Sequence, residues 1–210
     1  MHQEKAYPSL LLAKAVDAMA ALPGIGERTA LEHVLFLLSR PESETDRLTE
    51  ALSEFRHGVK FCKRCHCLSD GDICSVCSSP SRVQSMVCVV ENVGTVMSIE
   101  QAGTYMGVYH VLGGLISPAN GVGPGELQVE SLVERVHEGG IDEVCFALSP
   151  TMEGDTTAFY LWKKLSPLGV KITMIARGVV PGDRLQYVDS RTLARSIEDR
   201  HEFTVGGRQA

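Results

Sequence analysis

The 210-residue sequence lacks any apolar run of the roughly 18–20 residues that a membrane-spanning helix needs, which excludes an integral helical membrane protein. It also lacks an excess of positive charge, because 20 Lys and Arg stand against 26 Asp and Glu. The formal charge of −6 excludes a histone-like protein that holds DNA by bulk positive charge. An export signal is missing as well, since Lys14 and Asp17 interrupt the short apolar run of residues 10–13.

Internal repeats and low-complexity segments are also absent, and a hydrophobic content of 44% is ordinary for a folded protein. The length allows one large domain or two to three small modules. Seven cysteines in a chain without an export signal favour metal binding or free thiols over a disulfide framework. We therefore expect a cytoplasmic protein with no membrane association.

Residues 9–60 show helical periodicity. Apolar residues recur at spacings of three and four in three segments: Leu12, Val16 and Met19; Leu31, Leu35 and Leu38; Leu48, Leu52, Phe55 and Val59. Ser43, followed three residues later by Asp46, predicts a capping box that opens the third helix. Each helix is expected to have one apolar stripe.

The first motif, Leu22-Pro23-Gly24-Ile25-Gly26, lies between two of these helices. Its two glycines allow positive φ, and the amides that follow open a helix whose N-terminus favours a phosphate. Arg28 can add a charge-assisted contact to that phosphate. We predict a DNA-backbone contact by Gly24, Gly26 and Arg28, the alternative being a tight turn in which Leu22 and Ile25 fill the core.

The second motif is Cys62-x2-Cys65-x8-Cys74-x2-Cys77. Two C-x2-C turns complete the tetrahedral four-thiolate shell that zinc prefers, and a closed shell is structural rather than catalytic. Zinc binding can order residues 61–82, which have too few apolar side chains for a core. His66 and Cys67 are left out of the ligand set because a C-x-C spacing fits the turn less well. Cys88 and Cys145 lie in apolar strands and are expected to be small hydrophobes.

From residue 86 onward, short buried strands alternate with amphipathic helices, which predicts a mainly parallel sheet covered on both faces. The expected strands are Met86–Val90, Val108–Leu112, Val144–Leu148 and Ile172–Ile175. The expected helix stripes are Leu132, Val133 and Val136, and Ala158, Leu161, Trp162 and Leu165. His110, inside a strand, is expected to be a hydrogen-bonded core residue.

The third motif is a set of carboxylates at strand ends: Glu91 after the first strand, and Glu153 and Asp155 after the third. Ligands collect at the C-terminal strand ends of such sheets, and three carboxylates there could hold Mg²⁺. The alternative is that Asp155 caps the helix that follows.

The order of the modules is more specific than any single motif. A hairpin with Leu22–Gly26, a four-cysteine knuckle and Val87-Cys88-Val89-Val90-Glu91 opening an α/β domain resemble the RecR family of bacterial recombination mediators. The resemblance covers residues 8–201 and continues through Tyr109–Gly114, Ile116–Pro118, Gly123-Pro124, Pro150–Gly154, Tyr187–Asp189 and Thr192-Leu193.

This resemblance implies a multi-module α+β protein. Its expected parts are a helix-hairpin-helix module (1–57), a four-cysteine zinc finger (58–82), an α/β Toprim domain (83–176) and a C-terminal segment (177–210) with a partly disordered tail. The implied site residues are Gly24, Gly26 and Arg28 for DNA, Cys62, Cys65, Cys74 and Cys77 for zinc, and Glu91, Glu153 and Asp155 as the Toprim acids. In this chain Asn92–Thr95 replaces a usually charged stretch, which weakens the case for Mg²⁺ beside Glu91.

The resemblance also implies a function. RecR-like proteins are non-enzymatic; they form dimers and ring-like tetramers that can encircle DNA, and act with RecO and RecF to load RecA onto gapped single-stranded DNA. The expected partners are therefore single- and double-stranded DNA, RecO, RecF and further copies of the chain. The alternative is a Mg-dependent Toprim enzyme that cleaves or rejoins DNA, and a third option is an adaptor whose hairpin contacts only protein.

Overall fold

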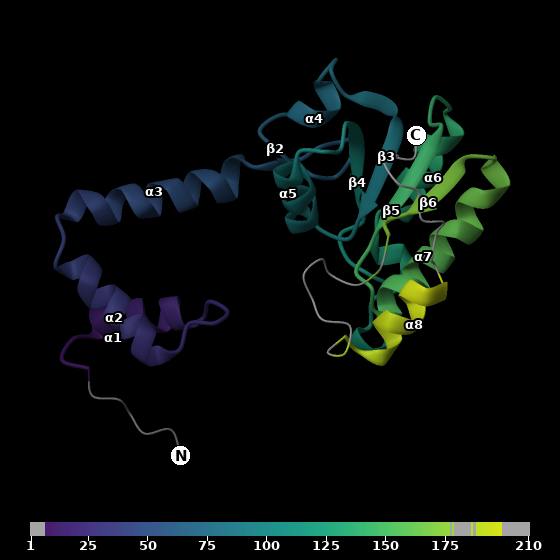
Figure 1. Cartoon of the computed structure of the whole chain (residues 1–210). Coiled ribbons are helices and arrows are strands. Elements are labelled where there is room, and N and C mark those ends of the chain that lie inside the picture. The colour runs from purple at the N-terminus through teal and green to yellow at the C-terminus, as the bar shows by residue number, and fades with distance from the viewer. Residues whose placement is uncertain (1–6, 177, 179–185, 187, 199–210) are drawn as a thin grey trace. The chain divides into compact units, whose positions relative to one another are not determined.

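The computed structural model of the chain describes residues 7–176, 178, 186 and 188–198 (Figure 1). The chain divides into two compact units, the first ending at Val59 and the second starting at Lys60. Over the described ranges, no helix has both the length and the apolar character needed to cross a bilayer. The predicted disordered tail beyond Phe203 lies outside the described residues.

The first unit consists of three helices, α1 (Leu10–Ala20), α2 (Glu27–Leu38) and α3 (Glu42–Gly58). The turn that carries the glycine motif joins α1 to α2. Val16 of α1 and Ala30 of α2 are fully buried, and no residue of α3 is buried. The three predicted helices are confirmed, but most of their apolar stripes remain uncovered on this unit.

The predicted capping box at the start of α3 is wrong. The helix begins at Glu42, its N-cap is Pro41, and no side chain caps it. Pro41 has a φ of −54° and ends the preceding connection, so the helix starts one residue before Ser43. Glu42 and Glu44 lie in the first turn, where acidic side chains favour the helix dipole.

The second unit opens with a small two-stranded sheet and a one-turn helix. β1 (Lys60–Phe61) and β2 (Leu68–Ser69) pair antiparallel, and α4 (Ser75–Ser78) follows. These short elements bring two turns of the chain together, each carrying one cysteine pair.

A four-stranded parallel sheet forms the body of the second unit, in the order β4-β3-β5-β6. Its strands, β3 (Val83–Val90), β4 (Gly107–Val111), β5 (Glu143–Ala147) and β6 (Lys171–Met174), confirm the four predicted strands with shifts at their ends. The helices are α5 (Val93–Ala102), α6 (Val129–His137), α7 (Met152–Leu165) and α8 (Ser190–Glu198), with 3-10 turns at Pro118–Asn120, Pro124–Glu126 and Ser166–Leu168.

Alternation along the strands places a core on each face of this sheet. Val87 and Val89 of β3 pack with residues of α6 and α7, such as Leu132 and Leu161. The intervening Cys88 and Val90 face the other way, in a smaller cluster that includes Val96 of α5. Figure 1 shows α5 on one side of the sheet and α6 and α7 on the other. The predicted parallel sheet covered on both faces is therefore confirmed.

Two helices of the α/β domain differ from the prediction. Helix α5 was not predicted, because its apolar residues give no clear stripe. Trp162 does not belong to the predicted buried stripe of α7, because it is 50% exposed and its ring stacks on Phe159. The buried residues of that helix are Gly154, Thr157, Ala158, Leu161 and Leu165.

Candidate functional site

The hairpin turn between α1 and α2 presents the start of α2 to solvent. Gly24 has a φ of +81°, a conformation that L side chains rarely adopt, so a glycine is required there. Gly26 is the N-cap of α2, with extended backbone at φ −79° and no side chain to cover the first amides. Of the two glycines, which both allow positive φ, only Gly24 adopts it. The exposed amides and the helix dipole remain suited to an anion.

Arg28 lies in the first turn of α2 and its side chain is 93% exposed. Its Nε donates to Glu32 Oε1 one turn later, at 3.3 Å. An exposed pair of this kind contributes little free energy, so a phosphate can take the place of the Glu32 carboxylate. The alternative core role of Leu22 is wrong, since Leu22 is 51% exposed, whereas Ile25 is half-buried.

The four cysteines of the finger come together as the spacing predicts. Cys62, Cys65, Cys74 and Cys77 are all buried, and their sulfur atoms lie within 4.8 Å of one another. The Sγ atoms of Cys65 and Cys74 are 3.5 Å apart. Four sulfurs around a tetrahedral zinc at about 2.3 Å are separated by about 3.8 Å, so the cluster fits this ion.

Backbone amides support the thiolate form of this cluster. The N–H of Cys74 donates to Cys62 Sγ at 3.3 Å, and the N–H of Cys77 donates to Cys74 Sγ at 3.5 Å. Burial raises the pKa of Cys62, but hydrogen bonds from the finger backbone outweigh it and lower the pKa to about 7. Without a metal ion, burial raises the pKa of Cys74 to about 11, and the pKa of Cys65 is raised by its contact with Cys77 and by burial. The thiolate is the form that binds a metal ion.

The finger is bonded directly to the sheet. The N–H of Val111 in β4 donates to the carbonyl oxygen of Cys65 at 2.8 Å. The next residue, His66, has a φ of +61°, and its Nε2 lies 2.9 Å from Ser131 Oγ of α6. His66 and Cys67 stay outside the four-sulfur cluster, as expected.

The remaining cysteines and His110 behave as predicted. Cys88 is buried in the apolar cluster under α5, and Cys145 is its register neighbour in β5. His110 is fully buried, and its Nε2 lies 2.7 Å from the carbonyl oxygen of Gln128. Burial is the main cause that lowers the pKa of His110, to about 3, which keeps the ring neutral.

Glu91, at the end of β3, is held across the strand ends by Ser149, which follows β5. Ser149 Oγ donates to Glu91 Oε1 at 2.9 Å, and the Ser149 N–H donates to Oε2 at 3.3 Å. The neighbouring Asn92 caps α5, since its Oδ1 accepts the N–H of Thr95 at 3.0 Å. Asn92, the first residue of the uncharged stretch Asn92–Thr95, thus has a structural role as a helix cap.

The other two acids lie in the first turn of α7, whose N-cap is Thr151 and not Asp155. Glu153 lines the same hollow as Glu91, whereas Asp155 lines a different hollow with Phe159 and Trp162. Among the described residues, the four cysteines are the only group of three or more acids, cysteines or histidines that converges for a metal ion. The described part of the chain therefore gives no support to the common magnesium site considered for the three acids.

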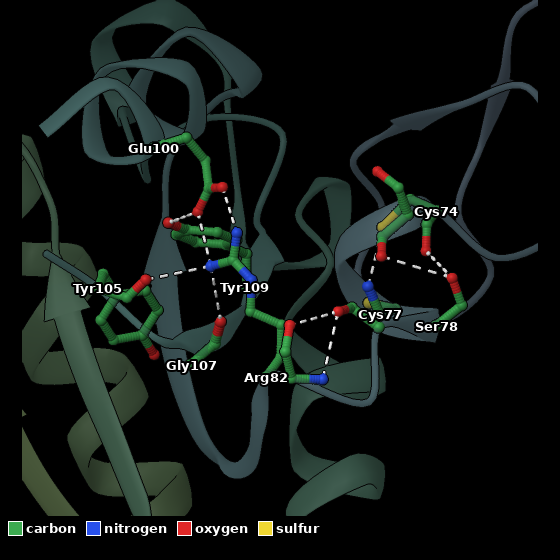
Figure 2. Close-up of polar contacts among 11 residues, drawn as sticks. Cys74, Cys77, Ser78, Arg82, Glu100, Tyr105, Gly107 and Tyr109 are labelled. Carbon is green, nitrogen blue, oxygen red and sulfur yellow. Dashed lines mark hydrogen bonds and ion pairs between the residues drawn. The ribbon is translucent and has the colours of Figure 1, made fainter. Parts of the chain in front are cut away.

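A polar cluster that the sequence reading missed joins the end of the finger to the α/β domain (Figure 2). Arg82 pairs with Glu100 of α5, and its Nη1 donates to the carbonyl oxygens of Tyr105 and Gly107 at 3.1 and 3.4 Å. The hydroxyl of Tyr109 donates to Glu100 Oε1 at 2.5 Å. These residues are far apart in the sequence and form no motif, so only the folded structure identifies them.

Comparison with known proteins gives the same order of modules. Residues 12–56 match the family model of the RecR helix-hairpin-helix, residues 59–79 that of the RecR four-cysteine zinc finger domain, and residues 85–176 that of the Toprim domain. The described helices α1–α3, the four-cysteine cluster and the parallel sheet lie within these three ranges, apart from a few residues at their ends.

The chain is also similar to whole curated proteins. It is 54% identical over 198 residues to the recombination protein RecR of Bacteroides fragilis, covering 94% of this chain and 97% of the relative. The RecR proteins of Porphyromonas gingivalis and Flavobacterium psychrophilum are 51% and 52% identical, each covering 94% of this chain and 96% of the relative. With its hairpin, four-cysteine finger and Toprim sheet in this order, the chain belongs to the RecR family of recombination proteins.

Proposed function

We propose that this protein is a non-enzymatic, DNA-binding recombination mediator in DNA repair. It forms a ring-like oligomer and acts with RecO and RecF to load RecA onto gapped single-stranded DNA. The observation that carries the proposal is the exposed start of α2, where Gly26 leaves the helix amides open and Arg28 is 93% exposed. Family membership supports the partners.

The negative charge of the protein limits how it holds DNA. Residues 86–176 carry 10 acidic and 4 basic side chains, so the α/β domain accounts for an excess of six negative charges. Contact is therefore local, through Gly24, Gly26 and Arg28 at the hairpin. Binding per subunit is weak and salt-sensitive, and encirclement by several subunits increases the overall affinity.

The variant Arg28→Glu tests the hairpin. At low salt we expect at least tenfold weaker binding to single-stranded and gapped DNA, and a salt dependence of log K reduced by about one phosphate contact. The matched control is Arg47→Glu, which reverses an exposed cation on α3 away from the turn. Equal affinities for Arg28→Glu and the unaltered protein would contradict the DNA assignment and favour an adaptor that binds only protein.

We also propose that Cys62, Cys65, Cys74 and Cys77 hold one structural zinc ion per chain. The ion would order the finger, since this stretch has few apolar side chains of its own. The seven cysteines form no disulfide in the structure, which suits a reducing compartment, and we place the protein in the cytoplasm. The domain boundaries at 57/58, 82/83 and 176/177 are part of this proposal.

The competing function, a Mg-dependent enzyme that cleaves or rejoins DNA, has less support. Glu91 is bonded to Ser149, and Asp155 does not share a hollow with the other two acids. Incubation of labelled DNA with the protein and Mg²⁺ or Mn²⁺ decides between the two functions. We expect intact DNA; cleavage that Glu91→Gln abolishes would establish the enzyme instead.

A further inference from the structure

Arg135 of α6 is a buried cation whose hydrogen bonds are incomplete. Only 7% of the residue is exposed, and its Nη1 donates to the carbonyl oxygen of Tyr109 in β4 at 2.8 Å. Its Nε and Nη2 are buried and have no hydrogen-bond partner within the described part of the chain. A buried guanidinium is costly unless a negative charge lies nearby, so its surroundings must supply one.

The surroundings of Arg135 are the four-cysteine finger. Ser131, one turn earlier on the same face of α6, contacts His66, the residue after Cys65. The strand that accepts the Arg135 hydrogen bond also donates, through the N–H of Val111, to the Cys65 carbonyl oxygen. The face of α6 and the segment of β4 that hold Arg135 are thus the ones bonded to the first cysteine turn.

The finger and α6 also share a hollow of about 760 Å³. Arg135 and Ser131 line it from the helix, and Lys63, Arg64 and Ile73 line it from the finger. Lys63 is already paired with Asp72, at 2.6 Å. Among the cations that line this hollow, Arg135 is therefore the deeply buried one. It lies where α6 and β4 meet the finger.

We infer that Arg135 is the counter-charge of the four-thiolate metal centre of Cys62, Cys65, Cys74 and Cys77. The inference rests on the zinc site proposed above. A zinc ion with four thiolates carries a net charge of about −2, which is buried here together with the sulfurs. A buried guanidinium nearby offsets part of that charge.

The electrostatics of Arg135 agree with this role. Burial lowers the pKa of Arg135, and the nearby Arg64 acts in the same direction. Electrostatic interaction with Cys77, Cys65 and Cys62 acts in the opposite direction and raises the pKa of Arg135. The finger cysteines therefore favour the charged form of Arg135, which burial disfavours.

The test uses the full-length protein and the variants Arg135→Lys, Arg135→Gln and Arg135→Met. After the zinc content of each protein is measured, the rate of zinc transfer to an excess of a chromogenic chelator is followed. Outer partners of metal ligands are worth about 10–100-fold in metal affinity, so we expect about 10–100-fold faster zinc loss from Arg135→Met. Arg135→Lys retains the charge and should lie between Arg135→Met and the unaltered protein.

The matched control is Arg82→Met, which removes a partly buried arginine at the end of the finger that pairs with Glu100 of α5. It should lower the melting temperature while leaving the zinc loss rate unchanged. A second readout is the sulfur-to-cobalt charge-transfer band of the Co²⁺-substituted proteins, which should shift in Arg135→Gln but not in Arg82→Met. A merely structural arginine would change stability and not this band.

The outcomes separate the two proposals. Absence of zinc from the unaltered protein would overturn the zinc site itself. Bound zinc, with the same loss rate and cobalt spectrum in Arg135→Gln and Arg135→Lys as in the unaltered protein, would overturn the role of Arg135 alone. If Arg135→Met does not fold, Arg135→Gln and Arg135→Lys provide the test.

Discussion

Gly154, in the first turn of α7, shows how closely the chain approaches itself near the strand ends. A Cβ at this position would lie 1.9 Å from the carbonyl oxygen of Ser149, the residue that also bonds Glu91. The position excludes any side chain because the obstacle is backbone and cannot rotate away. Glycine here lets the turn between β5 and α7 close.

Gly154→Ala should therefore destabilise the protein by about 1–3 kcal/mol, since the backbone around Ser149 must move. Urea unfolding, followed by circular dichroism, measures the change. Gly125→Ala is the matched control, because a Cβ there meets nothing within 4 Å. Equal midpoints for Gly154→Ala and Gly125→Ala would show that the turn can relax.

The Arg82–Glu100 pair should make stability depend on pH. Hydrogen bonds from Arg82 hold the pKa of Glu100 below its usual value of 4.5. The pair thus contributes stability above that pH and loses it as the pH falls through the lowered pKa. We expect Glu100→Gln to cost about 1–2 kcal/mol at pH 7 and progressively less below about pH 4.5.

Thermal unfolding of both proteins between pH 7 and pH 4 measures this difference. A cost of Glu100→Gln that stays constant over the whole range would show that the carboxylate charge is not what Arg82 recognises. Glu100→Gln also alters the hydrogen bond that Tyr109 donates to the same carboxylate. The variant Tyr109→Phe measures the contribution of that hydrogen bond alone.

At the scale of single elements, the residue that caps a helix is set by where the folded chain begins that helix. Asn92 caps α5 through its side chain, whereas Ser43, predicted as a cap, lies inside α3. Asn92→Ala should cost about 1 kcal/mol, the usual contribution of an N-cap. Ser43→Ala should change the free energy of unfolding by less than about 0.5 kcal/mol. The reverse order of the two values would contradict the assignment of these caps.

The finger is the element that depends on the metal. Cys62→Ser should abolish zinc binding, and the finger should unfold with it, because zinc coordination supplies its folding free energy. Zinc content and proteolysis of the region around residues 60–80 measure the two effects. Cys67→Ser is the control, since Cys67 lies outside the four-sulfur cluster. A protease-resistant, zinc-free Cys62→Ser variant would contradict the structural role.

At the scale of the whole molecule, an apolar face of α3 is exposed on the first unit and is the surface on which the proposed oligomer can be tested. Leu48, Leu52 and Phe55 are 40%, 60% and 57% exposed. Their spacings of four and three are typical of helices packed against other helices. We propose that a second copy of the chain covers this face as part of the oligomer.

Leu52→Asp should then shift the solution mass toward the monomer, as measured by sedimentation over a range of concentrations. Thr49→Asp adds the same charge on another face of α3 and should leave the mass unchanged. An oligomer of unaltered mass in Leu52→Asp would place the self-association elsewhere on the chain.

The sequence by itself determined the local features of this protein. The four strands, the three N-terminal helices and the cysteine cluster follow from periodicity and spacing within a few residues. Such local patterns can therefore be recognised in the sequence without knowledge of the fold. The C-x2-C turns, for example, bring Cys62 and Cys65 to one point whatever surrounds them. The family resemblance, too, depends on short strings in a fixed order.

Only the tertiary structure decided which distant residues meet. The sheet order β4-β3-β5-β6 brings Ser149 to Glu91, and the packing of α6 against β4 buries Arg135 beside the finger. It also separates Asp155 from the other two acids, which the sequence had grouped at one edge. Such contacts depend on which strands become neighbours and on which face of each helix packs against the sheet. Local sequence patterns do not determine either.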